Sequence, residues 1–162
     1  MKKTKKRVVV LSMIMMLVIS GLAVPAKAKP QGYKFSYKKA TVYMSGPAKN
    51  LIKKAGKPKS KKAKKSCAYK GKDRTYKYKD FILYTYSNSD KGAEFVNGIT
   101  FLTSKVSTKE GIRIGSSFSN VKKKYGEVKD RFGVYTYKKG KSKLQIEVTD
   151  DVVTNIRYII AK

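Results

Sequence analysis

The sequence predicts an α+β fold in which two tandem units, each a short helix followed by antiparallel strands, form one sheet with the helices packed on it. Three observations lead to this prediction. A short amphipathic segment that ends in Gly occurs twice, at 48–56 and 118–126. Each copy is followed by stretches in which apolar and polar residues alternate, as they do in half-buried strands. Two Tyr-x-Tyr motifs, at 76–78 and 135–137, are separated by 59 residues.

The N-terminal segment has the three parts of a secretory signal peptide. A cationic start at 2–7 precedes an uncharged, largely apolar run at 8–24, and Ala26 and Ala28 provide the small residues of a cleavage site. We expect cleavage after Ala28, so that residues 1–28 are removed and the mature chain is secreted. The positive charge of the secreted chain could also retain it at the cell wall. The alternative is an uncleaved anchor, because a span needs about 17–25 residues and this run has 17. No other membrane contact is predicted.

The mature chain, 29–162, is long enough for a single domain with its own core. We divide it into unit one, about 33–104, and unit two, about 108–162. Helices are predicted at 48–55 and 118–125, because apolar residues recur there at helical spacing and a Gly follows each segment. Strands are predicted at 74–79, 81–86, 95–103, 133–138, 143–149 and 152–160, and short β-prone stretches precede the helices at 41–44 and 111–114.

The mature chain is strongly basic. Six of the 39 Lys and Arg residues lie within the first 28 residues, which leaves 33 against ten acidic residues and a net charge of +23. Such a charge attracts polyanions, although most of the cations are Lys, which also serve as a solvated surface. The segment 57–66 has no hydrophobic period, so we expect a mobile basic loop. Its lysines are the candidate polyanion-binding residues: Lys57, Lys59, Lys61, Lys62, Lys64 and Lys65.

The composition offers little catalytic chemistry. The absence of His excludes triads with a His base and metal sites built on His. Cys67 is the only cysteine, so no internal disulfide can form, and we expect it to be a small buried residue, with a reactive thiol as the alternative. The acids at 73, 80 and 150–151 are interpreted as turn or surface residues. We therefore predict no catalytic residue, no metal site and no cofactor.

Several segments resemble known proteins. The runs 66–73, 76–78, 81–86 and 108–115 resemble a group of uncharacterised secreted proteins of Gram-positive anaerobes, and the tandem layout resembles the β-lactamase inhibitory protein fold. The second resemblance implies a concave sheet that grips a partner through aromatic side chains. The disulfides of that inhibitor cannot form here, and no residue can be matched to its inhibitory contacts. Inhibition of a β-lactamase is therefore not predicted.

The functional expectation is a non-catalytic binding module of the bacterial cell envelope or exterior. It would recognise a protein or an anionic envelope polymer through a Tyr-rich sheet face and a basic surface, without a specific nucleic-acid site. Tyr combines area, rigidity and a polar tip, which suits recognition, but it is also a common cross-strand residue. The candidate partner-binding residues are Tyr76, Tyr78, Tyr84, Tyr86, Tyr135, Tyr137 and Tyr158. Two alternatives remain: a secreted enzyme with a carboxylate or Ser–Lys site, and a structural envelope protein.

Overall fold

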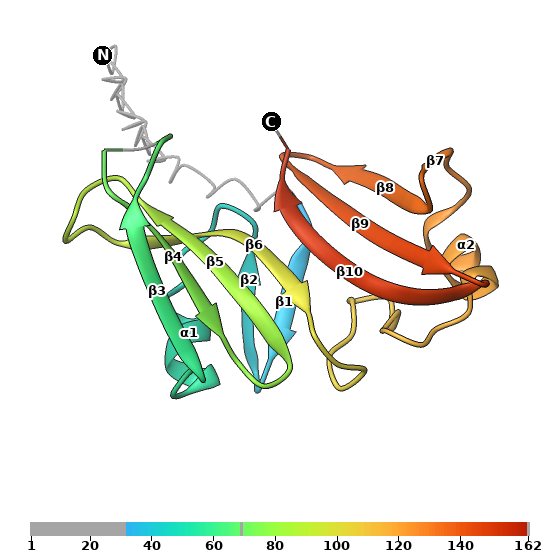
Figure 1. Ribbon diagram of the computed structural model, residues 1–162, viewed down its shortest axis with the longest axis horizontal. Coiled ribbons are helices and arrows are strands. Elements are labelled where there is room, and N and C mark those ends of the chain that lie inside the picture. The colour runs from blue at the N-terminus through green and yellow to red at the C-terminus, as the bar shows by residue number, and fades with distance from the viewer. Residues whose placement is uncertain (1–31, 69, 162) are drawn as a thin grey trace, which may run out of the picture.

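The computed structural model describes residues 32–68 and 70–161, so the predicted signal peptide at 1–28 lies outside the described residues. The described part consists mainly of antiparallel strands, together with two short helices (Figure 1). The prediction of an α+β class with an antiparallel sheet is confirmed at this level. Neither of these helices is long and apolar enough to cross a membrane.

Eight of the ten described strands form one antiparallel sheet. The elements are, in chain order, β1 Lys34–Tyr37, β2 Ala40–Tyr43, α1 Lys49–Ala55, β3 Ser60–Lys65, β4 Lys72–Lys77, β5 Phe81–Ser87, β6 Glu94–Phe101, α2 Phe118–Tyr125, β7 Asp130–Arg131, β8 Val134–Lys139, β9 Ser142–Thr149 and β10 Val152–Ile160. The sheet order is β3-β4-β5-β6-β10-β9-β8-β7, and β1 and β2 form a separate hairpin. Helix α1 therefore precedes β3–β6 in the chain, α2 precedes β7–β10, and the two groups of strands meet where β6 pairs with β10.

One face of the large sheet is covered by the hairpin and by helix α2. Phe35 of β1 packs against Phe81 and Phe101, with ring centroids 5.0 and 5.6 Å apart. Phe118 of α2 packs against Tyr135 of β8 at 4.2 Å. Figure 1 shows the hairpin and both helices behind the sheet. The hydrophobic core lies between these two layers.

No described element covers the opposite side of the sheet, which we call the open face. Directly paired residues of neighbouring antiparallel strands lie on the same face. The strand register therefore defines two rows of the open face. The first row is Lys62, Thr75, Tyr84, Gly98, Ile159 and Lys143, and the second is Ser60, Lys77, Ile82, Thr100, Arg157 and Gln145.

Both predicted helices are confirmed, because they depend on local signals. Leu51 of α1 and Val121 of α2 are fully buried, as the helical spacing of apolar residues requires. Each helix ends at a Gly with a positive φ, 82° at Gly56 and 80° at Gly126. Gly adopts this backbone region without the steric penalty that a Cβ incurs.

The six strands predicted after the helices are confirmed to within two residues at each end. Two other expectations fail. Strand β1 was not predicted, since its turn to β2 uses Lys38 and Lys39 at φ values of 45° and 63°, which Lys rarely adopts. The β-prone stretch 111–114 is not a strand, because Gly111 and Gly115 both have a φ of 89° and turn the chain on either side of it.

Candidate binding surface

Most of the predicted partner-binding tyrosines face the core. Tyr76, Tyr78, Tyr137 and Tyr158 are between 0 and 5 % exposed. In a strand, residues two apart point to the same side, and for the Tyr-x-Tyr motifs at 76–78 and 135–137 that side is the covered one. The interpretation of these four side chains as direct partner contacts is therefore wrong.

The remaining three tyrosines are half-buried, and two of them lie on the open face. Tyr135 shares the covered face with Tyr137 and packs against α2. Tyr84 and Tyr86 of β5 point the other way, and the Tyr86 ring lies 5.6 Å from the ring of Phe95. Of the seven candidate tyrosines, Tyr84 and Tyr86 thus remain as aromatic contacts for a partner on the open face.

A hollow lies next to Tyr84, where the two groups of strands meet. The register between β5 and β6 shifts there, because Tyr84 pairs with Gly98 but Thr85 pairs with Val96, which leaves Asn97 as the extra residue of a bulge. A Cβ at position 98 would lie 2.9 Å from the backbone oxygen of Tyr158. Gly98 therefore lets β6 approach β10 closely and leaves an open depression of about 380 Å³. Its lining residues are Tyr84, Asn97, Gly98, Thr100, Arg157 and Ile159.

The walls of the hollow combine apolar surface with a few polar groups. The ring of Tyr84 and the side chain of Ile159 lie on either side of Gly98. The guanidinium Nη2 of Arg157 donates to Oε1 of Glu147 at 3.1 Å, so the charge at the rim is paired. Sequence reasoning missed this hollow, although an isolated Gly inside a strand is the usual signal of a bulge or a close backbone approach.

We expect Gly98→Val to lower the free energy of unfolding by about 2 kcal/mol, within the range of about 1–3 kcal/mol that is typical of overpacking. The new side chain must displace the backbone of β10 and also fills the hollow. Chemical denaturation measures the effect. The matched control is Asn97→Ala in the same bulge, where the side chain is exposed and the expected change is below about 0.5 kcal/mol. Equal effects of the two substitutions would show that a side chain at position 98 does not destabilise the fold through contact with β10.

The lysine-rich segment is a strand, so the prediction of a mobile loop at 57–66 is wrong. Residues Ser60–Lys65 form β3, which pairs with β4 over its whole length and lies at one edge of the sheet. All six residues of β3 are exposed. The hydrophobic alternation on which the sequence prediction depended is absent because the covering layer does not bury this edge strand.

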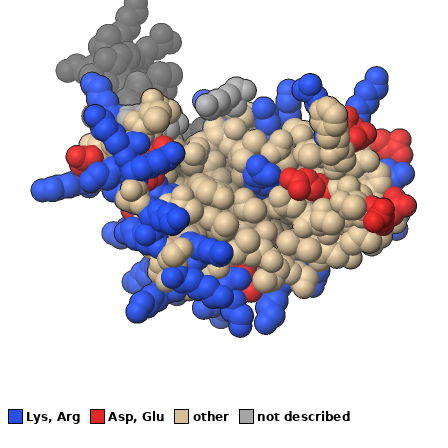
Figure 2. Space-filling model, viewed as in Figure 1, with Lys and Arg blue, Asp and Glu red and all other residues tan. Residues whose placement is uncertain are grey.

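The six candidate lysines are placed together along this edge. Lys57 and Lys59 precede β3, and the other four lie within it. The ammonium group of Lys61 lies 5.1 Å from the ring centre of Tyr76, which is within the range of a cation–π contact. In the part of the chain that the structure describes, none of the six forms an ion pair. Figure 2 shows Lys and Arg gathered over the β3 side of the molecule, whereas the middle of the visible face is mostly uncharged and contains one basic group beside one acidic group.

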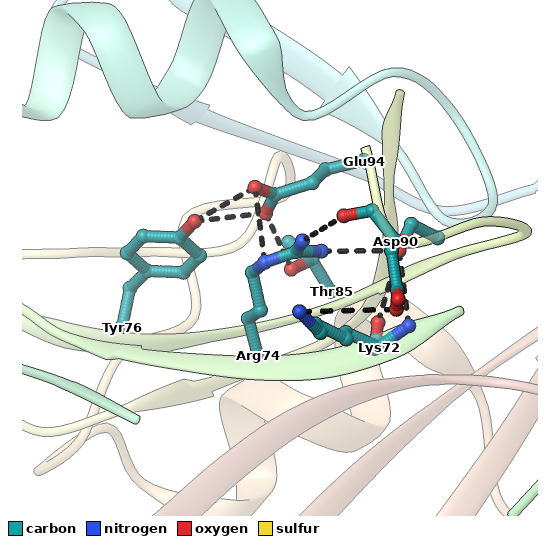
Figure 3. A network of polar contacts seen from close by, with 7 residues as sticks. Lys72, Arg74, Tyr76, Thr85, Asp90 and Glu94 are labelled. Carbon is teal, nitrogen blue, oxygen red and sulfur yellow. Dashed lines mark hydrogen bonds and ion pairs between the residues drawn. The ribbon is translucent and has the colours of Figure 1, made fainter. Parts of the chain in front are cut away.

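A polar network on the covered face fixes β4, the neighbour of this lysine strand (Figure 3). The hydroxyl of Tyr76 donates to the carboxylate of Glu94 at 2.9 Å from each oxygen, and the hydroxyl of Thr85 donates to Oε2 at 2.8 Å. The Nε atom of Arg74 lies 3.6 Å from Oε1 of the same carboxylate. Glu94 therefore connects β4, β5 and β6.

The network continues from Arg74 to the end of the β5–β6 hairpin. Nη1 of Arg74 donates to the Ser87 hydroxyl at 3.1 Å, and Nη2 donates to the backbone oxygen of Asp90 at 3.2 Å. The side chains of Arg74 and Glu94 are only 12 and 21 % exposed. Because the described partners occupy both oxygens of Glu94, the arrangement is that of a structural cross-link between strands rather than of a free acid or base.

The other residues considered for chemistry are dispersed. Asp80 is buried and accepts hydrogen bonds from Tyr37 and Thr103 at 3.1 and 3.0 Å. Asp150 and Asp151 occupy the β9–β10 turn with φ values of 49° and 59°. Cys67 is exposed between β3 and β4, so the expectation of a buried cysteine is wrong. Within residues 32–68 and 70–161, no three His, Cys, Asp or Glu side chains lie close enough to hold a metal ion.

Comparison with known proteins adds no relative. No protein-family model matches the chain, and no curated protein or solved structure matches it. The resemblance to the β-lactamase inhibitory protein fold therefore remains a prediction.

Proposed function

We propose that this chain is a secreted, non-catalytic binding module of the bacterial cell envelope or exterior that holds a protein or an anionic envelope polymer. The binding surface is the open face of the sheet, and the lysines of β3 extend it at one edge. The observation that carries the proposal is the uncovered tract around Gly98. It combines a tyrosine, a hollow and polar groups on the same sheet face as Lys62 and Lys64 of the edge strand β3, which have no described counter-charge.

The features of this tract support recognition better than chemistry. Aromatic side chains with a polar tip are frequent among the residues that dominate binding energy, and Tyr84 provides one beside a recess. Concave sites lined by apolar walls with a few polar groups are typical of binding pockets. The paired charges of Arg157 and Glu147 orient a partner without a large cost of desolvation, since both side chains are more than a third exposed.

We also propose that the chain is a tandem repeat. Each helix is followed by four strands, and the last strand of each set pairs with the other in antiparallel fashion. This order supports two units that are related by an approximate two-fold axis near the β6–β10 pair. The layout is similar to that expected from the β-lactamase inhibitory protein fold.

Binding of the purified protein to cell-envelope fractions, measured at several salt concentrations, tests the proposal. We expect Tyr84→Ala to weaken binding at least tenfold, because truncation of a central interface aromatic typically costs about 2 kcal/mol or more. The matched control is Phe132→Ala at the β7–β8 turn, where the side chain is 100 % exposed and lies outside the open face. Unchanged binding by the Tyr84 variant, or equal losses for both variants, would contradict the proposed surface.

A further inference from the structure

We propose that the outer edge of β3 accepts an extended acidic peptide segment of a partner, which adds to the sheet as a ninth strand. This inference rests on the proposed binding role but uses a different surface from the hollow. The partner is defined by two chemical properties: a backbone that can form a β-ladder and carboxylates that match the lysines of β3.

The hydrogen bonds around β3 identify the backbone groups that point outward. The amide of Ser66 donates to the oxygen of Gly71 at 3.0 Å, in the same register that pairs Lys64 with Asp73 and Lys62 with Thr75. Hydrogen-bonded and non-hydrogen-bonded pairs alternate along an antiparallel ladder. Lys62 and Lys64 therefore direct their peptide groups toward β4, and the residues between and beside them direct theirs away from it. These outward residues are Lys61, Ala63 and Lys65.

The next strand pair supports this assignment independently. The amide of Tyr78 donates to the oxygen of Phe81 at 2.9 Å, in register with the β4–β5 pairing of Tyr76 with Leu83. The even-numbered residues of β4 thus bond to β5, which leaves the odd-numbered ones to bond to β3. The two hydrogen bonds agree on which side of each strand is occupied.

The edge also has the form that strand addition requires. β3 has six residues that pair with β4 without a register shift, and it is the terminal strand of the sheet. Folded proteins usually block such an edge with a bulge, a proline, a short strand or charged side chains. Of these, the six residues of β3 have only the charges.

Those charges select the kind of strand that can add. Lys62 and Lys64 lie on the open face, and Lys61 and Lys65 lie on the other. A second copy of β3 would bring like charges together, so self-association through this edge is unfavourable. In an acidic strand, alternate carboxylates are about 6.6–6.8 Å apart, the same spacing as that of alternate lysines. Charge complementarity therefore favours an acidic segment over a neutral or basic one.

A substitution at Ala63 separates strand addition from simple charge attraction. Ala63→Pro removes an outward N–H and leaves every lysine in place. The fold should tolerate it, because proline is accepted at an edge where the N–H faces solvent. With a capped eight-residue peptide of alternating Glu and Thr as the probe, we expect at least a tenfold loss of binding. The control Ala63→Thr should bind the peptide as the original protein does, and circular dichroism verifies that both variants fold.

Three further measurements complete the test. Hydrogen exchange should show new protection at the amides of Lys61, Ala63 and Lys65 when the peptide binds. The same peptide N-methylated at alternate residues should bind at least tenfold more weakly. Lys62→Gln combined with Lys64→Gln should also weaken binding and reduce its dependence on salt.

Three outcomes would overturn the inference. The first is no measurable binding of the peptide. The second is equal binding of the N-methylated peptide or of inorganic polyphosphate, which would identify the edge as a site for any polyanion. The third is unchanged binding by the Ala63→Pro variant. Tyr84→Ala should not change peptide binding, so failure here is distinguishable from failure of the proposed open-face site.

Discussion

Raising the pH from 9 to 11 is expected to lower the free energy of unfolding by about 4 kcal/mol. Tyr33, Tyr76 and Tyr158 are 7 % exposed or less. Burial raises the pKa of Tyr33 from 10.0 to about 12, with a further contribution from the charge of Glu110. Burial also raises the pKa of Tyr76, which in addition donates to Glu94, and burial is the main cause of the raised pKa of Tyr158.

The sign follows from proton binding in the two states. Above pH 10 the tyrosines of the unfolded chain lose their protons, whereas the three folded side chains keep theirs until the pH passes about 12 for Tyr33 and higher values for the other two. The unfolded state then binds fewer protons, so its free energy falls relative to that of the folded state. Each tyrosine contributes about 1.4 kcal/mol over the whole interval from pH 9 to 11, because the unfolded side chain is only half ionised at pH 10. Their contribution is fully present below pH 10 and is lost as the pH rises.

Denaturation with guanidinium chloride at pH 9, 10 and 11 measures this dependence, and absorbance at 295 nm follows the ionisation of tyrosine directly. Tyr33→Phe should reduce the difference between pH 9 and pH 11 by about 1.4 kcal/mol, because one titrating group is removed. The backbone amide of Tyr33, which donates to Ser142, is unaffected by the substitution. A stability that stays flat between pH 9 and 11 would contradict the burial of these hydroxyl groups.

Replacing Glu94 by Ala is expected to lower the free energy of unfolding by about 3 kcal/mol, since removal of one partner of a largely desolvated ion pair leaves the other charge without compensation. Arg74, whose side chain is only 12 % exposed in the original protein, loses its ion-pair partner, and the hydroxyls of Tyr76 and Thr85 lose their acceptor. Because the edge strand β3 pairs with β4, we also expect faster exchange of the backbone amides in both strands. Chemical denaturation and amide exchange are the measurements.

The control for this prediction is Tyr76→Phe, which removes one hydroxyl and keeps the carboxylate and Arg74 together. It should cost about 1 kcal/mol, the usual net value of one hydrogen bond. If Glu94→Ala and Tyr76→Phe cost the same, the ion pair contributes nothing and the network is only a set of independent hydrogen bonds.

The sequence was sufficient for features that depend on neighbours in the chain. The spacing of Leu51 and Val121 with their neighbours, together with the glycines at 56 and 126, correctly placed both helices. The alternation at 143–149 likewise placed β9. In each case the pattern of residues within the segment is enough to predict the helix or the strand, and contacts with distant residues do not change that prediction.

The features that the sequence did not predict depend on what packs on each face. Successive side chains of a strand point to opposite faces of the sheet, so the sequence separates them into two sets. It does not show which of the two faces another layer of the protein covers. Tyr76 and Tyr84 therefore look alike in the sequence, although one is buried beneath the covering layer and the other lies on the open face. For the same reason the sequence predicts a loop where β3 lies, since an uncovered edge strand such as Ser60–Lys65 shows no hydrophobic pattern.

The pairing of β6 with β10 has a consequence for the order in which the sheet can assemble. Ile99 of β6 is the partner of Tyr158, so the central ladder joins residues 59 positions apart. On the side of β6 away from β5, the residues around Val96 bond to the earlier segment 45–48, whereas residues 98–100 bond to β10, which lies much later in the chain. Contacts between distant residues form late and slow the folding reaction. Until β10 is in place, the part of β6 around Ile99 has an unpaired edge, and unpaired strand edges make a partly folded chain prone to aggregation.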